Sequence, residues 1–394
     1  MSEKLNDHSS RAHAVLSASS AHRWLACPPS AVAAAGYPNE SSPYAKEGTL
    51  AHEVAEKAAD WRDMAVECRA IYGDLAGYLN LLDDVGDVTQ EMIECAIGYA
   101  DYIQEQIKND DAVLLLEQRV DFSPWVPHGF GTCDCIILQG DKMTVIDYKY
   151  GVGVPVSAEN NPQMKLYALG ALNDFGIAYD VTHVEMHIYQ PRINNISSSC
   201  LVVEDLMEWA EKTVKPIAQK AAKGKGDYNA GDHCKFCPHA GRCRQLTKVC
   251  TEYVETHSLR AAVPVLAPHE VAEVLAMEPL IALWLKRVKA QALATLLDGG
   301  EVPGWKVVEG KLGNRKWADE MKVVEVLFAA GYSQAEITET KLLSPAAMDK
   351  ALGKKKVAEL LEDLVDRSPG APTVVPVSDK RPAYNRADDF EKLD

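Results

Sequence analysis

Two short apolar runs in the middle of the chain, separated by four polar or turn-forming residues, predict a β-hairpin. The runs are 136–138 and 143–146, and the sequence Gln-Gly-Asp-Lys lies between them. A Gly-Asp pair in this setting is typical of a two-residue loop, in which Gly140 supplies a positive φ at the first position. The residues that flank the loop then pair with each other, which fixes the register of both strands. The same kind of pattern predicts strands at 112–120, 132–138, 143–149, 181–189 and 198–203.

Helical spacing of apolar residues predominates on both sides of this sheet. It is found in residues 21–110 and 204–223, and again in residues 255–300. A further helix is expected to begin at Pro162, with Asn161 as its N-cap. We therefore expect an α/β (α+β) protein, with a mixed central sheet flanked by helices and a helical C-terminal region.

Composition divides the chain into four expected parts. They are a flexible N-terminus at 1–20, a core at 21–255, a mainly helical region at 256–366 with a small β element at 303–317, and a disordered, Pro-rich acidic tail at 367–394. We see no charged-then-apolar signal segment and no uncharged run of about 18 residues that would span a membrane. The expected location is therefore the cytoplasm, without a membrane partner.

The hairpin register places two carboxylates opposite each other. Counting back from the loop, Asp134 faces Asp147, and Lys149 lies two residues further along on the same face as Asp147. Directly opposed residues of antiparallel strands have Cβ atoms about 4.5–5.5 Å apart, where like charges are destabilising. Two carboxylates held that close share either a proton or a cation. The cation has the better chemistry, because hard divalent ions bind carboxylate oxygens.

Polar residues on two helices accompany this pair of carboxylates. Gln163 and Tyr167 are four residues apart on the helix that follows, and His52 lies on a helix that precedes the sheet. Taken singly, each is an ordinary helix residue, and a lone histidine is more often a surface or satisfied core residue than a ligand. Their order along the chain supports a functional role for them more than any one of these residues does alone.

Four short motifs, taken in order, carry a resemblance to a known superfamily. They are GTLAH at 48–52, GTCD at 131–134, DYK at 147–149 and QMKLY at 163–167. In this order they resemble the GxxxH, GxxD, DxK and QxxxY motifs of the RecB-like branch of the PD-(D/E)XK nuclease superfamily, and some phage-encoded proteins share the layout. The resemblance implies a restriction-endonuclease-like core at 21–255. It also implies a metal-dependent DNA nuclease, in particular an exonuclease that acts on DNA ends or single strands.

The same resemblance implies roles for the motif residues. The ligands that it implies for Mg²⁺ or Mn²⁺ are His52, Asp134, Asp147 and the main-chain carbonyl of Tyr148. Lys149 would orient the attacking water or stabilise the charge that develops on the phosphate. Gln163 and Tyr167 would hold the DNA strand or steady the metal ligands.

Cysteine spacing predicts a second metal site. The chain has ten cysteines, and the expected cytoplasmic location argues against a disulfide framework. Three of them cluster as Cys234-x2-Cys237-x5-Cys243, and a soft or borderline metal prefers four ligands. The candidates for the fourth ligand are His233, His239 and the distant Cys27. Three thiolates and one imidazole would form a structural zinc site, which the spacing permits.

The resemblance favours iron over zinc at this second site. An iron–sulfur subgroup of the RecB-like nucleases, including AddB-type subunits and CRISPR-adaptation exonucleases, has one cysteine before the nuclease core and three after it. Cys27 and the triplet Cys234, Cys237 and Cys243 match that arrangement, which implies a [4Fe–4S] cluster, with Zn²⁺ as the alternative. The other six are expected to be small buried residues, with the last of them as a spare ligand: Cys68, Cys95, Cys133, Cys135, Cys200 and Cys250.

The overall charge fits DNA binding less well than the motifs do. The net charge is −16 and the isoelectric point is about 5.2, the wrong sign for a protein held to DNA by bulk electrostatics. A local channel can still be basic, and the helical stretch near 204–223 carries a run of lysines: Lys212, Lys215, Lys220, Lys223 and Lys225. The run is equally typical of a solvated helix face.

Two functions remain open beside the expected nuclease of phage DNA recombination, replication or repair in a bacterial host. One is a non-catalytic, DNA-processing scaffold that keeps the fold and the cluster. The other is a zinc-stabilised module whose acidic tail recruits a replication, recombination or single-strand-binding protein. Intact Asp134, Asp147 and Lys149 favour the nuclease, because a retired site usually loses one such residue.

Overall fold

The computed structural model describes residues 14–37, 43–64, 77–78, 88–258, 267–308 and 320–329, with the isolated positions 348, 353 and 359. The chain divides into two compact units, 1–308 and 309–394. In the second unit the structure describes helix α12 (Glu320–Ala329). The predictions made for the tail at 367–394 and for Cys68 lie outside the described residues.

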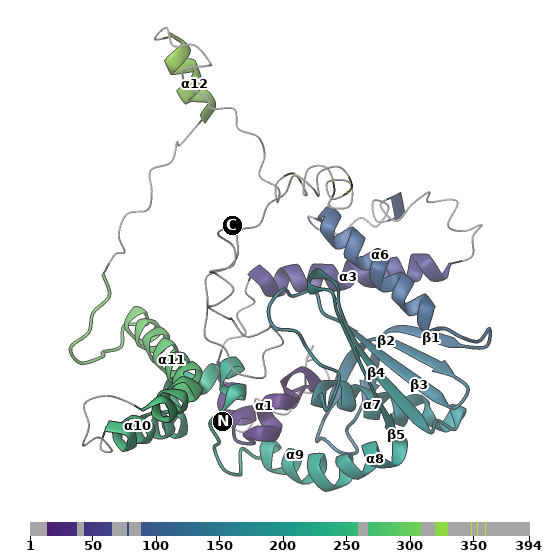
Figure 1. The fold of residues 1–394 in the computed structure, drawn as a ribbon, viewed down its shortest axis with the longest axis horizontal. Helices are drawn as coiled ribbons and strands as arrows, with labels where there is room; N and C mark the ends of the chain where they lie inside the picture. The colour runs from purple at the N-terminus through teal and green to yellow at the C-terminus, as the bar shows by residue number, and fades with distance from the viewer. Residues whose placement is uncertain are drawn as a thin grey trace, which may run out of the picture. The chain divides into compact units, whose positions relative to one another are not determined.

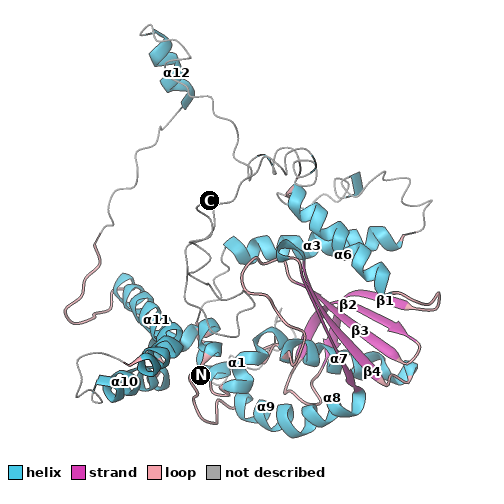
Figure 2. Ribbon diagram, in the orientation of Figure 1, coloured by secondary structure: helices cyan, strands magenta, loops and turns pink. Residues whose placement is uncertain are grey.

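A five-stranded mixed sheet forms the centre of the first unit (Figure 2). The strands are β1 (Val113–Asp121), β2 (Phe130–Gln139), β3 (Lys142–Tyr148), β4 (His183–Gln190) and β5 (Asn195–Val202). They lie in the order β1-β2-β3-β4-β5, with β3 and β4 parallel and the other neighbours antiparallel. The parallel pair requires a crossover, which helix α7 provides. The predicted mixed sheet is confirmed.

The central hairpin has the predicted register. Gln139 pairs with Lys142, and the ladder runs to Cys135 opposite Ile146. Gly140 has φ +58°, as a loop residue of this kind requires. The ladder therefore ends one residue before the two motif carboxylates.

Helices account for most of the rest of the first unit. Before the sheet come η2 (Ala18–Ser20), α1 (Ala21–Ala26), α2 (Ser30–Ala34), α3 (Pro43–Asp63) and α6 (Gln90–Gln106). Within and after it come α7 (Pro162–Tyr179), η3 (Pro191–Ile193), α8 (Val203–Trp209), the π-helical turn η4 (Ala210–Val214) and α9 (Lys215–Ala222). The last are η5 (Asp232–Phe236), η6 (Pro238–Arg242), α10 (Arg244–Ser258) and α11 (Pro268–Leu297). Helix α7 begins as predicted, because the Asn161 side chain accepts hydrogen bonds from the backbone N–H groups of Gln163 and Met164.

The two faces of the sheet are covered by different helices (Figure 1). On one face, Ile136 and Val145 pack in a core with α7, α1, α8 and α9. On the other, Ile137 and Tyr148 pack against α3 and α6. Because side chains of a strand alternate, neighbouring apolar residues enter both cores, which explains the continuous apolar runs in the sequence. Flanking helices on both sides confirm the predicted architecture.

One smaller prediction was wrong, and another can be compared with the structure only in part. Cys200 was expected to be buried, but it is exposed, because β5 is an edge strand whose residues alternate between partly buried and exposed positions. The β element expected at 303–317 is absent from its described part, 303–308, which forms a turn and irregular chain. Cys133, Cys135 and Cys250 are buried as expected, and Cys95 is partly buried. Among the described helices, none is both long and apolar enough to cross a bilayer.

Candidate metal centre and thiolate site

The first motif carboxylate, Asp134, lies in β2 just beyond the paired part of the hairpin. Its Oδ2 accepts a hydrogen bond of 2.7 Å from the backbone N–H of Tyr148 in β3. The Nδ1 atom of His52, on α3, lies 3.5 Å from the same oxygen. The ring of Tyr148 is fully buried and meets the His52 ring edge-on at a centroid distance of 5.4 Å. One strand-to-strand contact and one helix-to-strand contact therefore orient Asp134.

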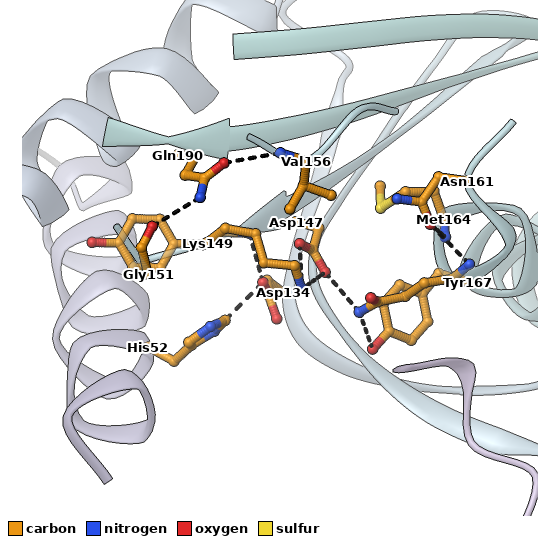
Figure 3. A network of polar contacts seen from close by, with 12 residues as sticks. His52, Asp134, Asp147, Lys149, Gly151, Val156, Asn161, Met164, Tyr167 and Gln190 are labelled. Atoms are coloured by element: carbon orange, nitrogen blue, oxygen red, sulfur yellow. Dashed lines mark hydrogen bonds and ion pairs between the residues drawn. The ribbon is translucent and has the colours of Figure 1, made fainter. Parts of the chain in front are cut away.

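The second motif carboxylate, Asp147, is only 2% exposed and points toward α7 (Figure 3). Its Oδ1 accepts a 3.0 Å hydrogen bond from Gln163 Nε2, which also lies 3.3 Å from the hydroxyl of Tyr167. The ammonium of Lys149 lies 2.8 Å from Asp147 Oδ2 and 3.1 Å from Oδ1. Helix α7 thus brings its glutamine and tyrosine to the end of β3, as the motif spacing predicts.

A carboxylate that the motifs do not include joins this site. Glu117, in the middle of β1, contributes an oxygen that lies within 4.8 Å of donor atoms of both His52 and Asp134, which also lie that close to each other. Asp147 is not part of this close set. The sequence offered one weak signal, a single glutamate directly after the four apolar residues that open β1.

The side-chain alternation of β1 and β2 is interrupted at matching positions, around Glu117 and Asp134. Glu117 has φ +46°, a left-handed conformation that is unusual for a glutamate in a strand. The β1–β2 ladder pairs the residues on either side of it but not Glu117 with Asp134. In β2, Cys133 packs with the α7 core and Cys135 with the α3–α6 core, although residues two apart normally share a face. The local reversal of side-chain direction turns both carboxylates toward His52.

Opposite charges set the protonation of the His52–Asp134 pair. Burial disfavours the charge of Asp134, but the charge and hydrogen bond of His52 and the charge of Lys149 hold the pKa of Asp134 below its usual value. Burial also opposes protonation of His52, yet the charge of Asp134 raises the pKa of His52. Each group therefore favours the charged form of the other.

The neighbouring groups respond differently. Burial raises the pKa of Asp147, and the charge of Asp134 adds to this effect while Lys149 acts against it. Burial disfavours the charge of Lys149, but Asp147 and Asp134 raise its pKa, so it stays protonated at neutral pH. Burial and the charge of Asp134 raise the pKa of Glu117 to about 7. The oxygen and imidazole donors gathered here are of the kinds that bind Mg²⁺ or Mn²⁺.

The four cysteines singled out by spacing line one cavity, although more than two hundred residues separate the first from the second. Cys27 follows α1, Cys234 lies in η5, and Cys237 and Cys243 flank η6. A side-chain hydrogen bond of 2.8 Å from Asn229 to the carbonyl of Ala26 joins the two segments.

The surroundings of Cys27 favour its thiolate. Burial acts against the charge, but hydrogen bonds to the His233 side chain and to the backbone of Asn229 and Ser30 lower the pKa of Cys27. Hydrogen bonds to Cys234 and Cys27 raise the pKa of His233 to about 10. His233 is therefore placed as a hydrogen-bonding partner of two sulfurs.

The donors at this cavity are spread more widely than the ligands of a single zinc ion. In the described part of the chain, no three of the sulfur and imidazole donors at this cavity lie within 4.8 Å of one another. Tetrahedral zinc with Zn–S bonds of about 2.3 Å requires sulfurs about 3.8 Å apart. In an iron–sulfur cluster each thiolate binds a different iron, so the sulfurs stand further apart.

The lysine run does not form a free basic surface in its first part. Lys212 and Lys215 pair with Glu208 and Glu211, one helical turn earlier. Such pairs on an exposed helix are typical of a solvated face.

Comparison with known proteins places the chain in a family. A family model described as a protein of unknown function (DUF2800) matches residues 13–382, and the chain belongs to this family. Among solved structures, the crystal structure of SSO0001 is similar to 49% of this chain and 85% of its own, at 15% sequence identity and a TM-score of 0.23.

Proposed function

We propose that this chain is a metal-dependent DNA nuclease, an exonuclease that hydrolyses phosphodiester bonds at DNA ends or in single strands. The observation that supports it most is the convergence of the four motifs. His52 from α3, Asp134 and Asp147 from adjacent strands, and the α7 pair meet through contacts of 3.5 Å or less (Figure 3). Accidental motif matches would have no reason to meet in this way.

In this proposal His52, Asp134, Asp147 and the carbonyl of Tyr148 hold Mg²⁺ or Mn²⁺. The bound ion would lower the pKa of a water molecule and offset charge on the phosphate. Lys149 remains protonated beside the carboxylates and donates to a phosphate oxygen as negative charge develops there. Gln163 and Tyr167 position Asp147 and, through it, the lysine.

We further propose that Cys27, Cys234, Cys237 and Cys243 bind a [4Fe–4S] cluster, with Zn²⁺ as the alternative. Its role is structural, because it would fasten the segment after α1 to the η5–η6 segment. An anaerobic visible spectrum with iron and zinc determination distinguishes the two.

The second candidate is a non-catalytic scaffold for DNA processing. It is favoured by the net charge of −16 and by the paired lysines, both of which weaken electrostatic attraction to DNA. In either case we propose that the protein acts in phage DNA recombination, replication or repair in the host cytoplasm, and that its acidic tail contacts a recombination or single-strand-binding protein.

Digestion of end-labelled single- and double-stranded DNA by the full-length protein with Mn²⁺ tests the nuclease against the scaffold. We expect cleavage with Mn²⁺ and none with a chelator. Asp147→Asn should abolish cleavage and leave the fold intact, because asparagine keeps an oxygen that can accept hydrogen bonds from Gln163 and Lys149. Asp141→Asn, at the hairpin loop, is the matched control and should cleave normally. DNA binding by the wild type without Mn²⁺-dependent cleavage would support the scaffold instead.

A further inference from the structure

We propose that Glu117, which lies outside the four motifs, is a further protein ligand of the divalent cation beside His52 and Asp134. The inference deepens the proposed function, because it concerns the same site. Under this inference, β1 contributes a carboxylate ligand of the cation in addition to the carboxylates from β2 and β3.

The distances between donor atoms support this assignment. One atom each from His52, Glu117 and Asp134 lies within 4.8 Å of the other two. At metal–oxygen distances of about 2.1 Å, two ligands of one Mg²⁺ ion lie about 3.0 Å apart when adjacent and about 4.2 Å apart when opposite, so the three donors would draw closer together on binding an ion. They come from α3, β1 and β2, so three separate elements converge on one point.

The β1 backbone supports it independently of the distances. Glu117 adopts φ +46° inside a strand, a left-handed conformation that is unfavourable for a glutamate. Glycine or asparagine would meet that backbone requirement at lower cost. A glutamate there is explained by its carboxylate, which the unusual backbone turns toward His52.

Charge balance favours Glu117 as an additional ligand beside Asp147. Asp147 already has the ammonium of Lys149 at 2.8 Å and the amide of Gln163 at 3.0 Å, so its charge is largely offset. Glu117 and Asp134 together carry two negative charges when ionised, and a neutral His52 adds none. That charge matches a divalent cation, and the imidazole favours Mn²⁺ over Mg²⁺.

Titration of Mn²⁺ alone into chelator-treated full-length protein tests the inference without using DNA. We expect Glu117→Gln to weaken Mn²⁺ binding by about tenfold or more, as loss of a ligand does. Asp134→Asn is the positive control. The matched control is Glu56→Gln, because Glu56 is on α3 close enough to act on the charge of Glu117 but is not one of the three close donors. It should bind Mn²⁺ almost as tightly as the wild type.

The outcomes separate a ligand from a nearby charge. Equal, small losses in Glu117→Gln and Glu56→Gln would overturn the assignment, as would a wild type that binds no Mn²⁺. Should Glu117→Gln fold poorly in a thermal melt, Glu117→Asn removes the carboxylate while tolerating the positive φ, and it must show the same loss. A wild type that binds Mn²⁺ through Glu117 but cleaves no DNA would uphold this inference and contradict the nuclease.

Discussion

Lys149 is the residue whose surroundings bear most directly on the proposed chemistry. Its ammonium contacts both oxygens of Asp147 and interacts with the charge of Asp134. These interactions outweigh the effect of burial and raise the pKa of Lys149. A lysine held in this way keeps its proton and has a fixed direction. Both are needed by a group that stabilises charge on a phosphate.

Lys149→Ala should therefore separate turnover from metal binding. We expect cleavage to fall by about 10²–10³-fold, the usual effect of losing one stabilising donor. Mn²⁺ affinity should be kept or increased, because a positive charge has been removed beside the site. The metal-free protein should lose stability on the order of 3 kcal/mol, since a buried carboxylate loses its partner. Single-turnover cleavage, Mn²⁺ titration and urea unfolding measure the three effects.

Lys142→Ala is the matched control for this variant. Lys142 is the first residue of the same strand and pairs with Glu185 at 2.8 Å, far along β3 from the carboxylates. It should leave cleavage unchanged. Loss of Mn²⁺ binding in Lys149→Ala would contradict the role proposed for Lys149.

At the scale of elements, the packing of β2 against α7 explains one motif glycine and not another. A Cβ atom on Gly131 would lie 2.8 Å from the Tyr167 ring, so this glycine lets α7 approach β2. A Cβ atom on Gly48, in α3, would meet nothing within 4 Å. The two glycines therefore differ in what they contribute.

Gly131→Ala should disturb the site through Tyr167 and Gln163. We expect destabilisation of about 1–3 kcal/mol from overpacking, together with slower cleavage. Gly48→Ala should be neutral or stabilise the protein by up to about 1 kcal/mol, because alanine favours a helix. Thermal melts and cleavage rates check both. If Gly131→Ala were as stable and active as Gly48→Ala, helix α7 could move away from β2 without loss of stability or activity.

The contact between β4 and α6 predicts a pH dependence of stability. His187 is 6% exposed and its Nδ1 lies 2.8 Å from the hydroxyl of Tyr102. Burial lowers the pKa of His187, with Lys142 acting in the same direction and Glu185 against it. Below about pH 6.5 the unfolded chain binds a proton that the folded protein resists, so stability falls as pH decreases.

His187→Asn should weaken this dependence while still bonding to Tyr102. Between pH 7.5 and pH 5, its melting temperature should fall less than that of the wild type. Identical slopes in the two proteins would mean that His187 is protonated as easily in the folded state as in the unfolded one.

Local sequence signals predicted part of this fold. Contacts between residues distant in sequence could not be predicted from such signals. The Gly-Asp loop fixed the hairpin register, and Asn161 with Pro162 marked the start of α7. Residues 122–129 between β1 and β2 carry no such signature, so nothing in the sequence indicated that Glu117 would lie close to Asp134. A left-handed glutamate in a strand is also contrary to its propensity, and the motif pattern alone could not reveal it.

At the scale of the whole first unit, the thiolate site joins the start of the fold to its later part. Cys27 follows α1, while Cys234, Cys237 and Cys243 lie beyond the sheet. Leu280 and Trp284 of α11 pack against the apolar side of the same cysteine segment. A metal held by all four thiolates would therefore join two segments that are distant in sequence, and α11 packs against the second of them.

Cys27→Ala should remove this link and show what it contributes. A ligand between residues 27 and 234 closes a loop of more than two hundred residues, and closing long loops restricts the unfolded chain most. We expect loss of the brownish absorption and iron, and faster proteolysis near α1, because ligation is coupled to folding. Cys95→Ala, on α6, should do neither. A Cys27→Ala protein with full iron content and unchanged protease resistance would move the fourth ligand to His233, His239 or Cys250. Adding Cys250→Ala, His233→Ala and His239→Ala one at a time in the same background would decide among them.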